Sequence, residues 1–204
     1  MKSTVPFLAK AIVIGLLSMF IGACAKPYHL YVKYDLPPKH IGLEGKQVAL
    51  KIIDERDSEA IFTEKAQNQF DMWDGTFALY HTDKKPKGEV QTYELLALLK
   101  EVMEKRLEAM GIQVMEGGME EAPLFELTLK KFLLDLKGQT WVSDISYEAK
   151  LTKDNKKIGR EQVSGQAERT KIMGKGAGEK LIGEIFSDSI NRLDIEKLFK
   201  NAGL

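Results

Sequence analysis

The sequence predicts an α+β fold: a mostly antiparallel or mixed sheet of about five to six strands, with two main helices packed on one face. Three observations predict it. Segments 92–110 and 179–193 carry apolar residues at spacings of three and four, the pattern of amphipathic helices. Segments between residues 124 and 169 alternate apolar and polar residues, as strands with one buried face do. The predicted helices are separated from the long run of strands, which is typical of this layer architecture.

Short strands are expected before the first helix. Segment 28–34 can form one, and segment 47–53 is a stronger candidate because its alternate residues are apolar. Residues 58–74 are polar and predict an irregular connection. The dipeptide Asp74-Gly75 indicates a turn before 76–81, which we expect to pair with 47–53.

The helix predicted over 92–110 has one apolar stripe, and Gly111 is placed to end it. A short strand over 112–115 should follow. The residues expected to face the core are Leu95, Leu99, Val102, Met103, Leu107 and Met110.

A three-stranded meander is expected next. In segment 124–136 the apolar parity changes across Lys130-Lys131, which predicts a β-bulge there. Segment 141–151 should turn back through Asp154-Asn155 into 157–169. The inward face of that last strand carries the small residues Gly159, Val163, Gly165 and Ala167, which would let the helix expected at 179–193 lie close.

The helix at 179–193 and a short final helix should complete the core. Asp194 is placed to cap the final helix. The residues expected to be buried are Leu181, Ile182, Ile185 and Ser189 in the first helix, and Ile195, Leu198 and Phe199 in the second.

The first residues of the chain predict an export signal. Lys2 and Lys10 precede an apolar run at 11–21, and small residues follow it. The run is too short to remain as a membrane span, because a helix needs about 20 residues to cross a bilayer.

Residues 21–24 (IGAC) resemble the lipobox of bacterial lipoproteins. The resemblance implies cleavage between Ala23 and Cys24, and attachment of diacylglycerol and an N-acyl chain to Cys24. No other cofactor is expected. Ala25 stands where an aspartate would favour retention at the inner membrane, which implies the outer membrane, facing the periplasm. The chain would then divide into a signal peptide (1–23), a lipidated tether (24–45) and one periplasmic domain (46–204).

Charge and cysteine content exclude several classes of function. The chain has 30 Lys and Arg against 30 Asp and Glu, whereas nucleic-acid-binding proteins concentrate basic charge. Nucleic acid is therefore not an expected partner. Cys24 is the only cysteine, so a disulfide framework within the chain is excluded.

No motif indicates an enzyme. The three histidines, His29, His40 and His81, lack metal-ligand spacing and predict no metal site, and no GxSxG motif is present. The carboxylates around Arg56 favour a salt-bridged turn. A divalent-cation site, or acid/base catalysis by Asp54 or Asp57, is the alternative.

Two segments are candidate binding sites. Gly174, Lys175, Gly176 and Gly178 precede a predicted helix and could hold an anion, although a flexible connection is the ordinary interpretation. Phe70, Met72 and Trp73 form an apolar trio in a polar segment and are a candidate contact patch for a partner. Trp141, on an alternating strand, is expected to pack in the core.

The whole pattern resembles the YajG-like family of uncharacterised bacterial lipoproteins. The resemblance rests on the lipobox, Asp54 and Arg56 at the end of a strand, the helix LLKEVMEKRLEAMGI and a meander closed by a helix. It implies an outer-membrane lipoprotein and transfers no catalytic residue. We therefore expect a non-enzymatic module that binds an envelope protein or peptidoglycan. An accessory subunit of an envelope lipid or solute transport system is the alternative.

Overall fold

The structure is a computed structural model that describes residues 27–39, 41–115, 122–170 and 177–204. It contains a five-stranded sheet in the order β5-β2-β6-β7-β8 and a three-stranded sheet in the order β1-β3-β4. The predicted α+β class is confirmed. The strands are β1 (Tyr28–Lys33), β2 (Gln47–Asp54), β3 (Trp73–Tyr80), β4 (Thr92–Tyr93), β5 (Gln113–Met115), β6 (Leu124–Lys137), β7 (Thr140–Lys153) and β8 (Lys156–Thr170). The helices are the 3-10 turn η1 (Ile41–Leu43), α2 (Glu64–Gln67), α3 (Leu95–Ala109), α4 (Ala177–Asn191) and α5 (Ile195–Asn201).

The large sheet is mixed. β2 pairs in parallel with β5 and β6, while β6, β7 and β8 form an antiparallel meander. The register of β6 shifts between Leu129 and Lys131, which confirms the predicted bulge. Asp154 and Asn155 have φ values of 51° and 58°, as a two-residue type I′ hairpin turn requires.

The small sheet differs from the prediction. We expected β3 to pair with β2, but β3 pairs in parallel with β1 and antiparallel with β4. Both edges of β2 are taken by β5 and β6. The segment 58–74 is also not merely irregular. It contains α2 and buries Phe62 and Phe70.

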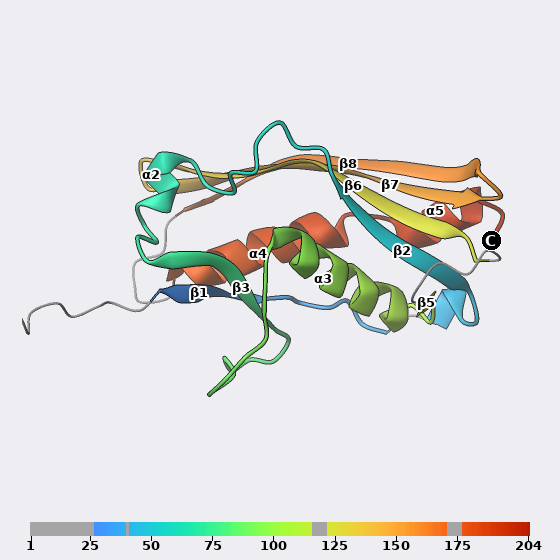
Figure 1. Ribbon diagram of the computed structural model, residues 1–204, viewed down its shortest axis with the longest axis horizontal. Coiled ribbons are helices and arrows are strands. Elements are labelled where there is room, and N and C mark those ends of the chain that lie inside the picture. Colours follow the sequence, from blue (N-terminus) through green and yellow to red (C-terminus); the bar gives the residue numbers. More distant parts are fainter. Residues whose placement is uncertain (1–26, 40, 116–121, 171–176) are drawn as a thin grey trace, which may run out of the picture.

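Figure 1 shows the layers. α3 and α4 lie on one face of the large sheet, and β1, which pairs with β3, lies on the far side of α4 from that sheet. The contact between α4 and β1 is close, since a Cβ atom built on Gly183 would stand 2.9 Å from the carbonyl oxygen of Lys33. β1 itself is part of the core: Leu30, Val32 and Tyr34 are buried. The fold therefore begins near Tyr28 rather than at the predicted boundary after residue 45.

The main helices follow the predicted stripes with small changes. α3 begins at Leu95 because Thr92 and Tyr93 pair with β3 instead. Gly111, at φ +85°, follows the helix as predicted. The buried face of α3 also includes an unexpected charged residue, Arg106.

The C-terminal helices pack as expected, except at Gly159. Asp194 accepts a hydrogen bond from the backbone of Lys197 and caps α5. Gly159, where we expected the helix at 179–193, lies against α5 instead, and an added Cβ there would stand 3.0 Å from the carbonyl oxygen of Leu198. The predicted buried residues of both helices are buried.

Candidate functional site

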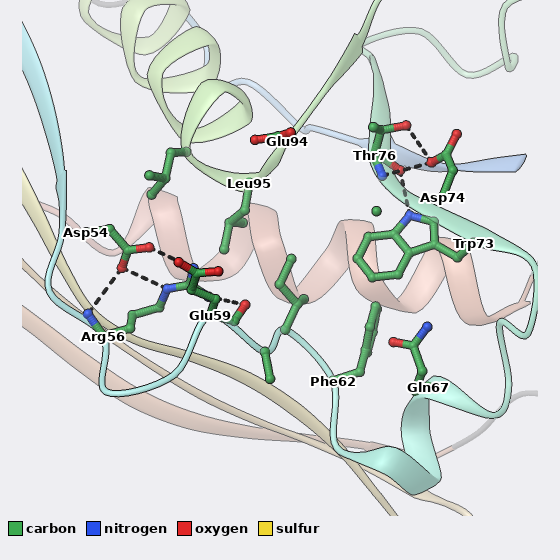
Figure 2. Close-up of a pocket in the computed structure, with 14 residues that line it drawn as sticks. Asp54, Arg56, Glu59, Phe62, Gln67, Trp73, Asp74, Thr76, Glu94 and Leu95 are labelled. Atoms are coloured by element: carbon green, nitrogen blue, oxygen red, sulfur yellow. Dashed lines mark hydrogen bonds and ion pairs between the residues drawn. The ribbon is translucent and has the colours of Figure 1, made fainter.

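A cleft of about 520 Å³ lies between the end of β2, the segment 59–62, the start of β3 and the N-terminus of α3 (Figure 2). It is open to solvent and has two unlike sides. Figure 2 shows Phe62 and Trp73 on one side, and Asp54, Arg56 and Glu59 on the other. The cleft therefore combines an aromatic wall with charged groups.

The aromatic wall is held rigidly. Trp73 is half-buried, with Phe62 packed edge-on at a ring-centroid distance of 5.1 Å. The indole Nε1 donates to the carbonyl oxygen of Thr76 at 2.6 Å. Asp74 fixes that short turn, because its Oδ1 accepts from the backbone N–H of Thr76 at 2.9 Å and from the Thr76 hydroxyl at 2.6 Å. The indole is thus fixed in the cleft with its polar edge already satisfied.

The charged side is built on one ion pair. The Arg56 guanidinium donates to both carboxylate oxygens of Asp54, at 2.9 and 2.8 Å, and to the carbonyl oxygen of Glu59 at 3.1 Å. These bonds hold the pKa of the Asp54 carboxyl below its usual value, with burial opposing them. A carboxylate held ionised and occupied in this way is unsuited to act as a general acid. The predicted salt-bridged turn is confirmed.

Two further carboxylates border the cleft. Glu59 and Glu94 are exposed, and in the described part of the chain neither forms an ion pair. Glu94 is the N-cap residue of α3, yet its side chain makes no capping hydrogen bond. The positive end of the helix dipole favours a negative charge at this place. Because Arg56 is neutralised by Asp54, the net charge of the cleft is negative.

The predicted contact patch needs correction. Phe70 is 6% exposed and packs against Phe62 and Trp141, at ring-centroid distances of 5.3 and 5.8 Å. It therefore cannot offer a surface. Met72 is exposed, and Trp73 turns into the cleft instead. The three side chains therefore do not form one surface in the described part of the chain. Trp141 is 1% exposed, which confirms its place in the core.

The glycine-rich segment lies mostly outside the described residues. This is true of Gly174, Lys175 and Gly176. Gly178 lies in the first turn of α4, and an added Cβ there would stand 3.0 Å from the Phe70 ring. Its observed role is close packing, and anion binding by this segment stays a prediction.

The two histidines that the structure describes, His29 and His81, have separate surroundings. His29 packs edge-on to Tyr31, His81 Nδ1 lies 3.3 Å from the carbonyl oxygen of Tyr34, and His40 is outside the described residues. Across residues 27–39, 41–115, 122–170 and 177–204, no group of three or more His, Cys, Asp or Glu side chains is arranged to hold a metal ion.

The sequence did not single out Glu59 and Glu94 as a pair, since they lie far apart along the chain and come to line one cleft only through the packing of α3. The turn signal Asp74-Gly75 was visible, but its role in fixing Trp73 was not. Ala23 and Cys24, the predicted cleavage and lipidation residues, lie outside the described residues. Within the described part, no helix is long and apolar enough to span a membrane.

Comparison with known proteins shows distant likenesses. No protein-family model and no curated protein matches the chain. A solved structure of protein XCC0632 from Xanthomonas campestris, of family DUF330, is 14% identical, with a TM-score of 0.49 over 87% of this chain and 96% of that one. Lipoprotein GNA1162 from Neisseria meningitidis is 10% identical, with a TM-score of 0.30 over 72% and 96%. A neuraminyllactose-binding hemagglutinin homolog from Helicobacter pylori is 10% identical, with a TM-score of 0.38 over 86% and 97%. At these TM-scores the likenesses carry no argument about function.

Proposed function

We propose that the protein is a lipid-anchored lipoprotein of the bacterial envelope that binds a partner without catalysing a reaction, and that the cleft beside Trp73 is its binding surface. The anchor is supported by the lipobox-like residues 21–24 and by the resemblance to the YajG-like family. Ala25 after the cysteine favours the periplasmic face of the outer membrane. The observation that carries the binding role is the fixed indole of Trp73 in a cleft that Glu59 and Glu94 also line, two carboxylates that form no ion pair with any described residue.

The charge of the cleft favours a protein partner with a basic segment. A lysine or arginine side chain can lie over the face of an indole and donate to carboxylates at the same time. Glu59 and Glu94 supply those carboxylates, whereas Asp54 is already occupied by Arg56. Because the Trp73 ring is fixed before binding, little side-chain freedom is lost on association.

Photo-crosslinking in cells tests the binding role. A photo-reactive residue replaces Gln67, which lines the cleft, in the full-length lipoprotein. The matched control replaces Gln162, an exposed residue of β8. We expect one dominant protein adduct from position 67 and none from position 162.

A charge variant makes the test specific. Replacing both Glu59 and Glu94 by glutamine should lower the yield of that adduct about tenfold, which corresponds to about 1.4 kcal/mol of binding energy. A glycan or lipid adduct from position 67, equal adducts from both positions, or an adduct insensitive to the double substitution would each overturn the proposed partner class. The anchor is tested separately by the mass of the mature protein, which must include acyl chains lost in the Cys24→Ala variant.

A further inference from the structure

Exposed large apolar side chains are few in the described part of the chain. They are Tyr28, Leu36 and Met72, at 39%, 38% and 39% exposure. Two of them are neighbours, since the backbone N–H of Tyr28 donates to the carbonyl oxygen of Met72 at 2.9 Å. Tyr28 opens β1 and Met72 immediately precedes β3, so the pair stands where the small sheet begins.

This end of the molecule is the one reached from the lipidation site. β1 and β3 begin at the end that also carries α2 (Figure 1). Only four peptide steps separate Cys24 from Tyr28. Even a fully extended chain spans at most about 14 Å over that length. A lipid-attached Cys24 lies at the bilayer surface, so Tyr28 must stay within reach of the lipid headgroups.

We propose that Tyr28 and Met72 form a membrane-contact patch that seats this end of the domain on the lipid surface. The inference rests on the proposed function, because it requires the lipid on Cys24. Tyrosine suits the boundary between headgroups and acyl chains, where its ring is apolar and its hydroxyl stays hydrated. Methionine is flexible and adapts to an irregular surface. The short tether keeps the patch at high local concentration near the bilayer, so even a weak contact would be occupied.

The nearby charges point to an apolar contact rather than an electrostatic one. The exposed charges at this end include the carboxylates of Glu64, Asp71 and Asp74 against the ammonium of Lys65, so they supply no attraction to anionic lipids. Glu179 is paired with Lys85 and adds no free charge. The membrane-contact patch should therefore bind neutral as well as anionic lipids, and added salt should not release it.

The absence of a second cysteine allows a direct measurement. In the acylated protein the Cys24 thiol is blocked, so a Met72→Cys substitution creates the one free thiol for a polarity-sensitive fluorophore. Leu36→Cys is the matched control, because that side chain is equally exposed and lies beyond the opposite end of β1. Both sites are on the surface, so neither label enters the core.

The acylated variants are reconstituted in vesicles of phosphatidylethanolamine and phosphatidylglycerol that contain a nitroxide-labelled lipid. We expect the fluorophore at position 72 to shift to shorter wavelength and to be quenched at least about twofold more than the one at position 36. Adding Tyr28→Ser should reduce that difference. Equal quenching at the two positions overturns the membrane-contact patch. It does not contradict the lipid anchor, provided that the intact mass shows acyl chains. A mass without acyl chains would overturn both proposals.

Discussion

The guanidinium of Arg106, on α3, donates to the carbonyl oxygen of Leu193, just beyond the end of α4. It also donates to the carbonyl oxygens of Ile190 and Asn191. Arg106 is only 7% exposed, and burial lowers the pKa of its guanidinium. The side chain stays charged because arginine is not deprotonated in proteins. A cation is well placed here, where the helix dipole leaves its negative end and the last carbonyls lack partners within the helix.

Replacing Arg106 by methionine should therefore destabilise the domain by about 3 kcal/mol, because three carbonyl oxygens at the end of α4 each lose a hydrogen bond from a charged donor. Urea unfolding of the chain lacking residues 1–24 measures this loss. Lys105→Met is the matched control. Lys105 pairs on the surface with Glu101, at 2.8 Å, and its loss should cost only about 0.4 kcal/mol. Equal losses in the two variants would show that Arg106 does not hold α4.

We expect the buried hydroxyl of Tyr34 to make the stability of the domain depend on pH in the alkaline range. Its hydroxyl donates to Asn191 Oδ1 at 2.8 Å, and burial raises its pKa from 10.0 to about 12. The folded state thus favours the neutral phenol. The contribution of Tyr34 to the free energy of unfolding should be fully present below about pH 10 and should fall as the pH rises towards about 12. The variant Tyr34→Phe should be less stable by about 1 kcal/mol at neutral pH but should lose less on this alkaline side. If the alkaline loss of the two proteins were identical, Tyr34 would not be the group that titrates.

Much of the fold could be predicted because local patterns determine it. The stripe of α3, the parity change at Lys130 and the turn at Asp154-Asn155 each depend on a few neighbouring residues. Side-chain period and turn chemistry act over such short distances, so a single sequence reveals them. The small inward residues of β8 predicted the close approach of a helix, but the helix expected there was α4, whereas the helix that approaches Gly159 is α5.

The pairing of the small sheet could not be predicted in the same way. β1 and β3 are parallel strands that lie far apart in sequence, and nothing in either strand specifies its neighbour. Phe62 and Phe70 looked like parts of a polar connection, but they bury their rings against Trp141. Such contacts depend on tertiary packing rather than on local periodicity.

The candidate site shows the same division. The salt bridge between Asp54 and Arg56 is local and was expected. The cleft itself arises because the N-terminus of α3 brings Glu94 opposite the start of β3. No spacing in the sequence relates Glu94 to Trp73 in that geometry, so the site emerged only from the fold.

We expect the ion pair of Asp54 with Arg56 to make the stability of the domain depend on pH in the acid range. Its bonds to Arg56 lower its pKa from the ordinary value of 3.8, so its contribution is present above that pH and is lost as the pH falls through the lowered value. The variant Asp54→Asn should lose about 1 kcal/mol at neutral pH and show a smaller further loss in acid. Asp57→Asn, which changes an exposed side chain, is the control. It should leave the stability at neutral pH and the loss of stability in acid nearly unchanged. Urea unfolding from about pH 2 to about pH 7 covers the window. Superimposable pH profiles for the wild type and Asp54→Asn would exclude this role.

The close contact of α4 with β1 can be tested by adding a methyl group at Gly183. The change in stability can have either sign, because helix propensity and overpacking act in opposite directions. In an isolated helix, Gly183→Ala should be stabilising by about 1 kcal/mol, because alanine has the higher helix propensity. Here the added methyl group would meet the backbone oxygen and nitrogen of Lys33, at 2.9 and 3.0 Å.

Backbone atoms cannot turn aside, so α4 would have to move away from β1, and overpacking of this kind costs about 1–3 kcal/mol. We expect a net loss of stability on urea unfolding. Lys180→Ala, at an exposed position of the same helix, should change stability little and controls for propensity. A stabilised Gly183→Ala variant would mean that α4 and β1 are not in such close contact, and β1 would then be less firmly part of the core.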